Sequence, residues 1–202
     1  DAPLVRPLSI RWADTGYALC TVDVKSDHED LTADYAAIPA EMRAVAAAFG
    51  EETLRTVDPN VFYAEIARVR TACGDRAVLR AMHFFEEDKR ATLQAEALSR
   101  GDIDTFLALV RESGRSSAMY LQNTYVPGAV EAQAIMVALG CSERLLFGRG
   151  ASRVHGGGFA GTIQAFVPVE MLQDYQRGME AVFGPNSCHA LSIRPAGAVR
   201  VL

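Results

Sequence analysis

Four glycines lie within six consecutive positions, at Gly156, Gly157, Gly158 and Gly161. Residues 153–154 before them, and the alternating apolar residues 163, 165 and 167 after them, predict two strands joined by a glycine turn. Glycine tolerates positive φ and allows another part of the chain to approach the backbone closely. Two interpretations remain open: a tight hairpin with a glycine bulge, or a group of backbone amides that holds an anion. No Lys-Ser/Thr pair follows the cluster, so it is not a Walker loop.

The remainder of the chain predicts short strands near both ends with helices between them. The expected strands cover residues 4–12, 17–24, 189–193 and 199–202, and the first two form a hairpin through the turn at 13–16. The expected helices cover residues 33–37, 39–49, 61–73, 76–100, 103–113, 128–139 and 169–183. This order predicts an α+β fold, a ferredoxin-like split β-α-β sandwich in which a small antiparallel sheet packs against several helices.

Composition argues against several classes of function. The chain has 202 residues and a net charge of −5, whereas nucleic-acid binders usually carry a basic surplus. No apolar stretch approaches the ~20 residues that a membrane helix needs. The four cysteines, at 20, 73, 141 and 188, form no CxxC pair, which favours a reducing, cytoplasmic setting. Because the chain starts at Asp1 without a methionine, we expect it to be a segment of a longer protein.

The glycine cluster resembles a known sequence signature. Residues 153–162 read Arg-Val-His-Gly-Gly-Gly-Phe-Ala-Gly-Thr, which is similar to the third signature of the galactokinases, in the GHMP kinase superfamily. That signature has glycine where this chain has Ala160. Upstream, residues 24–35 resemble the segment of the same family that contains His-x-Leu-x-x-x-Tyr, and Tyr35 matches its tyrosine.

Two further segments extend the resemblance over essentially the whole chain. The spacing Arg80-x-x-His83-x-x-x-Glu87-x-x-Arg90 is similar to the family's long-helix pattern. A serine-rich segment at 113–120 resembles the region that follows, although Gly114 and Arg115 differ from the commonest form.

The resemblance implies a fold, a domain and an activity. Residues 1–202 would form the carboxyl-terminal domain of a GHMP kinase, and assignment of residues 1–16 to the sheet of a missing amino-terminal domain stays open. The full-length enzyme would convert galactose and ATP to galactose 1-phosphate and ADP. The alternatives are a non-catalytic galactose and ATP sensor on the same scaffold, and a stand-alone ferredoxin-like binding module.

The resemblance also implies site residues. Tyr35 would face the sugar, and Gly156, Gly157, Gly158 and Gly161 would support the ATP phosphates. The catalytic aspartate and the Mg²⁺ ligands would lie outside this chain, so no catalytic or metal-binding residue is assigned within it. The chain alone is therefore expected to be inactive, with the missing amino-terminal domain, galactose and ATP as its partners, and with no nucleic acid or membrane partner.

Other polar residues have simpler structural interpretations. His28 lies among acidic residues in a turn that precedes a helix, where carboxylates favour the positive end of the helix dipole. His83 and Glu87 are four residues apart and share a helix face, so a structural polar pair with Arg80 or Arg90 is expected.

Overall fold

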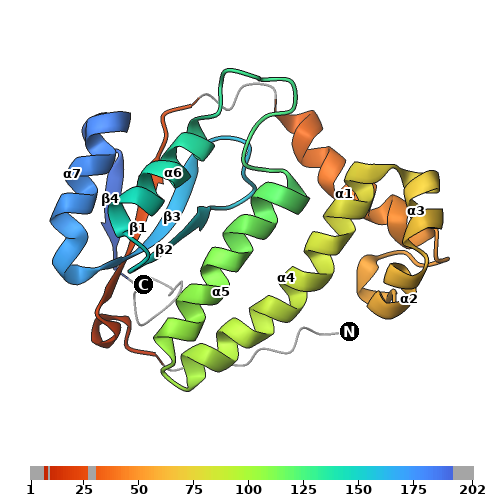
Figure 1. The fold of residues 1–202 in the computed structure, drawn as a ribbon, viewed down its shortest axis with the longest axis horizontal. Helices are drawn as coiled ribbons and strands as arrows, with labels where there is room; N and C mark the ends of the chain where they lie inside the picture. The colour runs from red at the N-terminus through yellow and green to blue at the C-terminus, as the bar shows by residue number, and fades with distance from the viewer. Residues whose placement is uncertain (1–6, 9, 27–30, 193–202) are drawn as a thin grey trace, which may run out of the picture.

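The computed structural model describes residues 7–8, 10–26 and 31–192. It contains a four-stranded antiparallel sheet in the order β2-β3-β1-β4. The strands are β1 (Tyr17–Asp23), β2 (Ala151–Val154), β3 (Thr162–Pro168) and β4 (Cys188–Leu191). Helices separate β1 from β2 and β3 from β4, and β3 lies between β1 and β2 (Figure 1). This is the split β-α-β order of a ferredoxin-like sheet, so the expected fold class is confirmed.

One face of the sheet is covered by two helices, α6 (Ala134–Leu146) and α7 (Leu172–Phe183). Cys20 lies opposite Ala165 and Val22 lies opposite Ile163 in the β1–β3 register, and all four side chains are fully buried. Alternate residues of a strand point to the same face, so these residues form the floor on which α6 and α7 pack.

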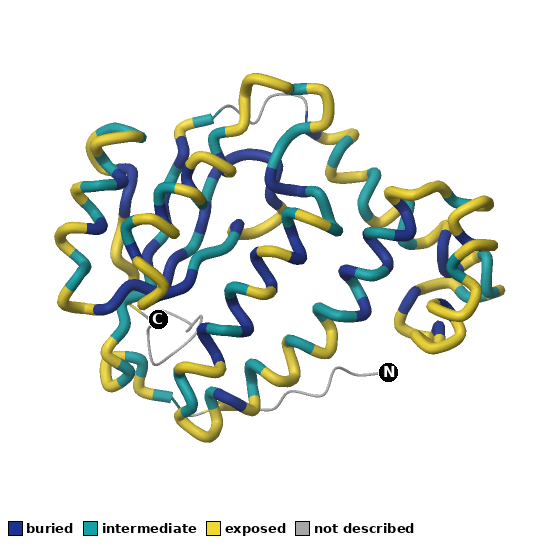
Figure 2. The backbone as a smooth tube through the Cα atoms, in the orientation of Figure 1, coloured by how far each residue is buried: buried dark blue, intermediate teal, exposed yellow. Residues whose placement is uncertain are grey.

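The other helices form a separate layer. The long helix α4 (Asp75–Ser99) packs along α5 (Ile103–Ser116), and α5 in turn contacts β2. The helices α1 (Thr32–Ala47), α2 (Pro59–Ala64) and α3 (Ile66–Cys73) gather around a second apolar cluster that includes Phe62 and Val69. Buried positions recur along α5, whereas in α4 they lie mostly in its first half (Figure 2). The described residues therefore have one large apolar cluster between the sheet and α6 and α7, and another among α1–α4. A third cluster lies between α4, α5 and the sheet.

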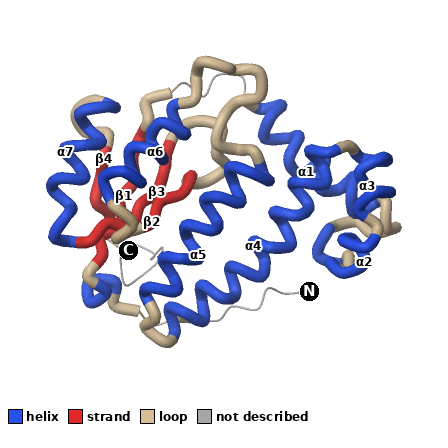
Figure 3. The backbone as a smooth tube through the Cα atoms, in the orientation of Figure 1, coloured by secondary structure: helices blue, strands red, loops and turns tan. Residues whose placement is uncertain are grey.

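Several connecting segments meet at one end of the sheet, beside the start of α1 (Figure 3). They are the segment after β1, the irregular segment between α5 and α6, and the glycine-rich loop between β2 and β3. Hydrogen bonds join the glycine-rich loop to each of the other two segments. The predicted strand, glycine turn and strand at 153–167 are confirmed.

The expected amino-terminal hairpin is wrong for the described residues. Residues 7–8 and 10–16 contain no strand, and Trp12–Thr15 forms a 3-10 turn that ends at Gly16 with φ 78°. The ring of Trp12 packs against Phe106 and Phe166, which holds this segment over the sheet instead of along its edge. Both edges of β1 are already occupied, by β3 and β4. The strand expected at 199–202 lies outside the described residues.

Two of the expected helix boundaries are also wrong. α1 is a single helix that runs through Pro39, although proline cannot donate the usual hydrogen bond to the carbonyl of Tyr35. Packing on the carboxyl-terminal side of Pro39 maintains the helix, because Val45 and Ala46 are fully buried there. The single helix expected at 61–73 is instead divided between α2 and α3 at Glu65.

The helix expected at 128–139 is shifted towards the carboxyl terminus. α6 starts at Ala134 and continues through Gly140 to Leu146. Ile135, Ala138, Ser142 and Leu146 form a buried stripe with helical spacing on both sides of the glycine. Burial of this stripe outweighs the low helix propensity of a single glycine. The remaining predicted helices, at 76–100, 103–113 and 169–183, correspond to α4, α5 and α7 with small shifts at their ends.

Candidate functional site

The loop between β2 and β3 has an unusual backbone. Gly156, Gly158 and Gly161 have φ values of 66°, 83° and 92°. Phe159 is also in the left-handed region, with φ 61°, which is rare for a bulky residue. Such strain persists where surrounding contacts hold it, and it often marks functional sites. The loop therefore needs its glycines, and the strained Phe159 needs a firm anchor.

Phe159 is anchored in a small apolar cluster. Its side chain is 4% exposed and packs with Leu31 and Ala160. The methyl group of Ala160 lies inside this cluster, so the departure from the galactokinase signature at this position fills space instead of disturbing the loop. The ring of Phe159 also meets the ring of Tyr35 edge-on, with centroids 5.2 Å apart.

Tyr35 and the glycine loop, both predicted as site residues, are brought together. Tyr35 lies near the start of α1, and its hydroxyl donates a hydrogen bond to the carbonyl oxygen of Gly158 at 2.8 Å. A Cβ atom on Gly157 would lie 2.6 Å from the ring carbon Cε1 of Tyr35. The Tyr35 side chain remains 38% exposed. Glycine at 157 thus permits close approach of the tyrosine ring, whose outer side faces solvent.

Asn123, which sequence patterns do not single out, holds the other side of the loop. Its main-chain oxygen accepts a hydrogen bond from the amide of Phe159 at 2.5 Å, and its Nδ2 donates to the carbonyl oxygen of Gly157 at 3.0 Å. A Cβ atom on Gly158 would lie 2.1 Å from the Asn123 main-chain oxygen. Asn123 follows a π-helical turn, Ser117–Leu121, and lies beyond the serine-rich segment 113–120 that carries part of the family resemblance. This explains why spacing arguments miss it.

Most of the loop amides between 155 and 161 are engaged, but three are not. The amide of His155 donates to the Thr162 carbonyl, that of Phe159 to the Asn123 main-chain oxygen, and that of Ala160 to the Gly158 carbonyl. The amide of Gly161 donates to Ser26 Oγ at 3.4 Å. The amides of Gly156, Gly157 and Gly158 find no acceptor among the described residues. Successive free amides on a backbone of mixed handedness are a common arrangement for anion binding. This loop can therefore receive an anion without any basic side chain.

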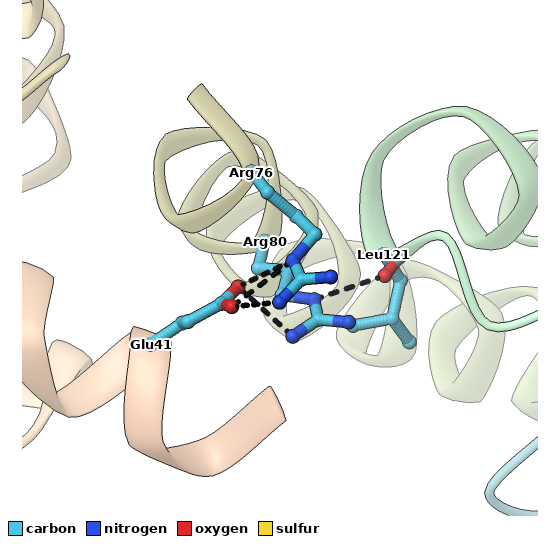
Figure 4. Close-up of polar contacts among 4 residues, drawn as sticks. All are labelled: Glu41, Arg76, Arg80 and Leu121. Carbon is cyan, nitrogen blue, oxygen red and sulfur yellow. Dashed lines mark hydrogen bonds and ion pairs between the residues drawn. The ribbon is translucent and has the colours of Figure 1, made fainter. Parts of the chain in front are cut away.

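An ion cluster around the buried Arg80 supports the segment that carries Asn123 (Figure 4). The side chain of Arg80, on α4, is 1% exposed and donates through Nη1 to Glu41 Oε2 at 2.9 Å and through Nε to the Leu121 carbonyl oxygen at 3.3 Å. Arg76 donates to the same carboxylate from the solvent side. α1, α4 and the π-helical turn are thus joined two residues before Asn123.

The long-helix pattern forms a second polar network beneath the loop. Glu87 accepts hydrogen bonds from Arg90 and Ser113 and lies 3.7 Å from Arg153 at the end of β2. His83 Nδ1 lies 2.9 Å from Ser116 Oγ. Burial lowers the pKa of His83, an effect that Glu87 opposes. The expected polar pairing on α4 is confirmed for Glu87 with Arg90, and the wider network connects α4, α5 and β2.

The cavities of the described residues lie away from Tyr35 and the glycine loop. A cavity of about 420 Å³ between α5 and α6 and another of about 470 Å³ beside Phe84 and Phe85 include neither Tyr35 nor the glycine loop. Within residues 7–8, 10–26 and 31–192, no group of three His, Cys, Asp or Glu side chains is placed to hold a metal ion. In the same ranges, no helix has the length and apolar character needed to cross a membrane.

Comparison with known proteins finds similarity to galactokinases. No family model matches the chain. Galactokinase of Glaesserella parasuis serovar 5 is 28% identical over 158 residues, which cover 78% of this chain and 39% of that protein. Galactokinase of Mannheimia succiniciproducens is 28% identical over 160 residues, which cover 79% of this chain and 40% of that protein.

A solved structure agrees with these sequence matches. The crystal structure of Lactococcus lactis galactokinase complexed with galactose matches with a TM-score of 0.69 and 18% identity, over 91% of this chain and 45% of that chain. This chain spans about two fifths of the length of the curated relatives it matches. Sequence and fold together confirm the resemblance to the carboxyl-terminal part of the galactokinases.

Proposed function

We propose that this chain forms the carboxyl-terminal domain of an ATP-dependent galactose kinase that acts in the cytoplasm. The full-length enzyme would transfer the γ-phosphoryl group of Mg-ATP to the anomeric hydroxyl of galactose, giving galactose 1-phosphate and ADP. The observation that carries the proposal is the set of free amides at Gly156, Gly157 and Gly158, next to a half-exposed Tyr35. The matches to galactokinases support the choice of sugar and nucleotide.

The role of the loop follows from its backbone. Phosphoryl transfer depends mainly on positioning and on stabilisation of charge by fixed donors. Backbone amides held by surrounding contacts are such donors, and they need no rearrangement when charge develops. Since the chain carries a net charge of −5, backbone donors are a suitable way for it to receive phosphate. Gly161, whose carbonyl accepts from the Val24 amide at 2.8 Å, would support the loop from the β1 side.

Tyr35 would contribute to the sugar site. Its hydroxyl proton is already donated to Gly158, so the hydroxyl oxygen remains available to accept a hydrogen bond from a sugar hydroxyl. The aromatic ring offers an apolar surface beside it. The sugar and the phosphates would thus lie beside the same loop. Tyr35 would contact both the sugar and the loop that receives the phosphates.

The catalytic base and the Mg²⁺ ligands would come from the preceding part of the protein. We therefore expect residues 1–202 alone to give no turnover, whereas the full-length protein should release ADP in a galactose-dependent manner in a coupled assay. Purified full-length protein that binds galactose and ATP without releasing ADP would indicate a sensor instead. Turnover by residues 1–202 alone would contradict the assignment of the catalytic base and the Mg²⁺ ligands to the preceding part of the protein.

A further inference from the structure

We propose that Asn123 is a positioning residue, which sets the direction of the Gly157–Gly158 peptide and thereby aims the Gly158 amide at a bound phosphate. The inference rests on the proposed function, because it concerns the same loop. It adds a residue that lies outside the glycine signature and does not itself need to touch the substrate. The inference is based on the hydrogen bonds made by two consecutive peptide units, Gly157–Gly158 and Gly158–Phe159.

The first peptide unit is oriented by the Asn123 side chain. Nδ2 of Asn123 donates to the Gly157 carbonyl oxygen at 3.0 Å. A trans peptide is planar, and its N–H points opposite to its C=O. Holding the Gly157 carbonyl towards Asn123 therefore directs the Gly158 amide away from Asn123. That amide has no acceptor among the described residues, so it is a donor with a fixed direction and no partner.

The second peptide unit is held at both ends. The Gly158 carbonyl accepts from the Tyr35 hydroxyl, and the Phe159 amide donates to the Asn123 main-chain oxygen. With its neighbour fixed, the Gly157–Gly158 unit can rotate only through the torsions of two glycines. Glycine has no steric preference strong enough to fix that rotation, so a side-chain donor is needed. Asn123 supplies that donor.

Asn123 is itself firmly placed. It is 2% exposed, and Gln122 before it has φ 57° at the end of the π-helical turn. The Leu121 carbonyl, two residues earlier, accepts from the buried Arg80. The Asn123 Oδ1 is buried and has no hydrogen-bond partner in the described part of the chain. An apolar residue would fill this position without leaving such an acceptor unsatisfied, so packing alone does not account for an asparagine here.

The sharpest test is Asn123→Asp in the full-length protein. The substitution keeps the size of the side chain but replaces the donor with a carboxylate, which repels the Gly157 carbonyl. We expect kcat/KM for ATP to fall by roughly 10- to 100-fold, the loss of one hydrogen bond to a charged group, with the galactose KM within about twofold of wild type. Asn123→Gln retains the amide group and should recover part of the loss.

A matched control is available at Gln133. Its Nε2 donates to the Val130 carbonyl at 3.0 Å in an exposed position, so Gln133→Glu makes the same chemical change away from the loop. It should leave the kinetics unchanged. If Asn123→Asp also leaves kcat and both KM values unchanged, the inference is wrong while the proposed function stands.

A second measurement does not depend on turnover. The ¹H–¹⁵N resonance of Gly158 in the wild-type full-length protein should shift on addition of inorganic phosphate or ADP, and the shift should be lost in Asn123→Asp. Should Asn123→Asp fail to fold by its thermal melt, Asn123→Leu, which removes the Nδ2 donor without adding a charge, serves for both measurements. If wild type has no kinase activity but the Gly158 shift depends on Asn123, the proposed function fails and the inference survives. No phosphate-dependent shift at Gly158 in wild type would overturn the inference.

Discussion

The hydroxyl of Tyr35 donates a hydrogen bond to the carbonyl oxygen of Gly158, across 123 positions of sequence. This bond joins the first helix to the loop between β2 and β3. It places the residue expected to face the sugar directly against the residues expected to support phosphate. Substitutions at either end therefore test the site as one unit.

Tyr35→Phe should weaken sugar use more than ATP use in the full-length protein. The change removes both the bond to Gly158 and the oxygen available to a sugar hydroxyl, while keeping the ring contact with Phe159. Loss of a hydrogen bond between neutral groups costs about 0.5–1.5 kcal/mol, so kcat/KM for galactose should fall several-fold. Steady-state kinetics with each substrate varied will decide. A change in the ATP KM alone would assign Tyr35 to the loop and not to the sugar.

Part of this candidate site can be predicted from the sequence. The clustering of Gly156, Gly157, Gly158 and Gly161 between two expected strands indicates the loop, and the sequence resemblance indicates Tyr35. The contact between them could not be derived, because it depends on how α1 approaches the loop. Asn123 could not be predicted for the same reason. A π-helical turn places it against the loop, and such a turn has no periodic sequence pattern.

The fold was also predictable where periodicity is strong. The apolar alternation in β3 and the spacing in α4, α5 and α7 gave correct elements. The errors lie where tertiary contacts override local signals. Residues 7–8 and 10–12 form no strand, and Trp12 packs against Phe106 and Phe166 instead. The helix α1 continues through Pro39 because its later residues are packed. Local propensity does not contain that information.

Gly158→Ala should destabilise the protein by considerably more than an ordinary left-handed glycine substitution. Alanine at φ 83° costs about 1–2 kcal/mol from backbone strain alone. Here the new Cβ would also lie 2.1 Å from the Asn123 main-chain oxygen, which is itself fixed by Phe159. The matched control is Gly128→Ala, where φ is 88° and an added Cβ meets nothing within 4 Å. If the two variants lose the same melting temperature relative to wild type, the loop is not closely packed at Gly158.

Glu41→Gln should destabilise the protein more than Arg76→Gln. The side chain of Arg80 is 1% exposed, and Glu41 is the carboxylate that balances its charge. Removing one partner of a buried pair leaves the other uncompensated, at about 3–5 kcal/mol when both are fully buried; we expect about 2–3 kcal/mol here because Glu41 is 23% exposed. Arg76 is 44% exposed, so its loss should cost less than about 1 kcal/mol. Urea unfolding monitored by circular dichroism measures both, and the reverse order would contradict the role given to Arg80.

Stability should fall in mildly acidic solution because of His83. Burial between α4 and α5 lowers the pKa of its imidazole below the ordinary value of 6.5, so the unfolded chain takes up a proton more readily than the folded one. The stabilising effect of the neutral imidazole is complete above about pH 6.5 and is lost as the pH falls towards the lowered pKa. Three charged groups act on it: Glu87 favours protonation, while Arg153 and Arg90 oppose it.

The measurement is a comparison of wild type with His83→Gln. Glutamine can still bond to Ser116 but cannot titrate, so the variant should lose less melting temperature than wild type between pH 7 and about pH 5. At pH 8 the difference in melting temperature between the two proteins reflects packing alone. The change in that difference as the pH falls reflects the titration of His83. If the two melting curves stay parallel over the whole range, His83 does not titrate in this window, and the buried network of α4 and α5 is insensitive to mild acid.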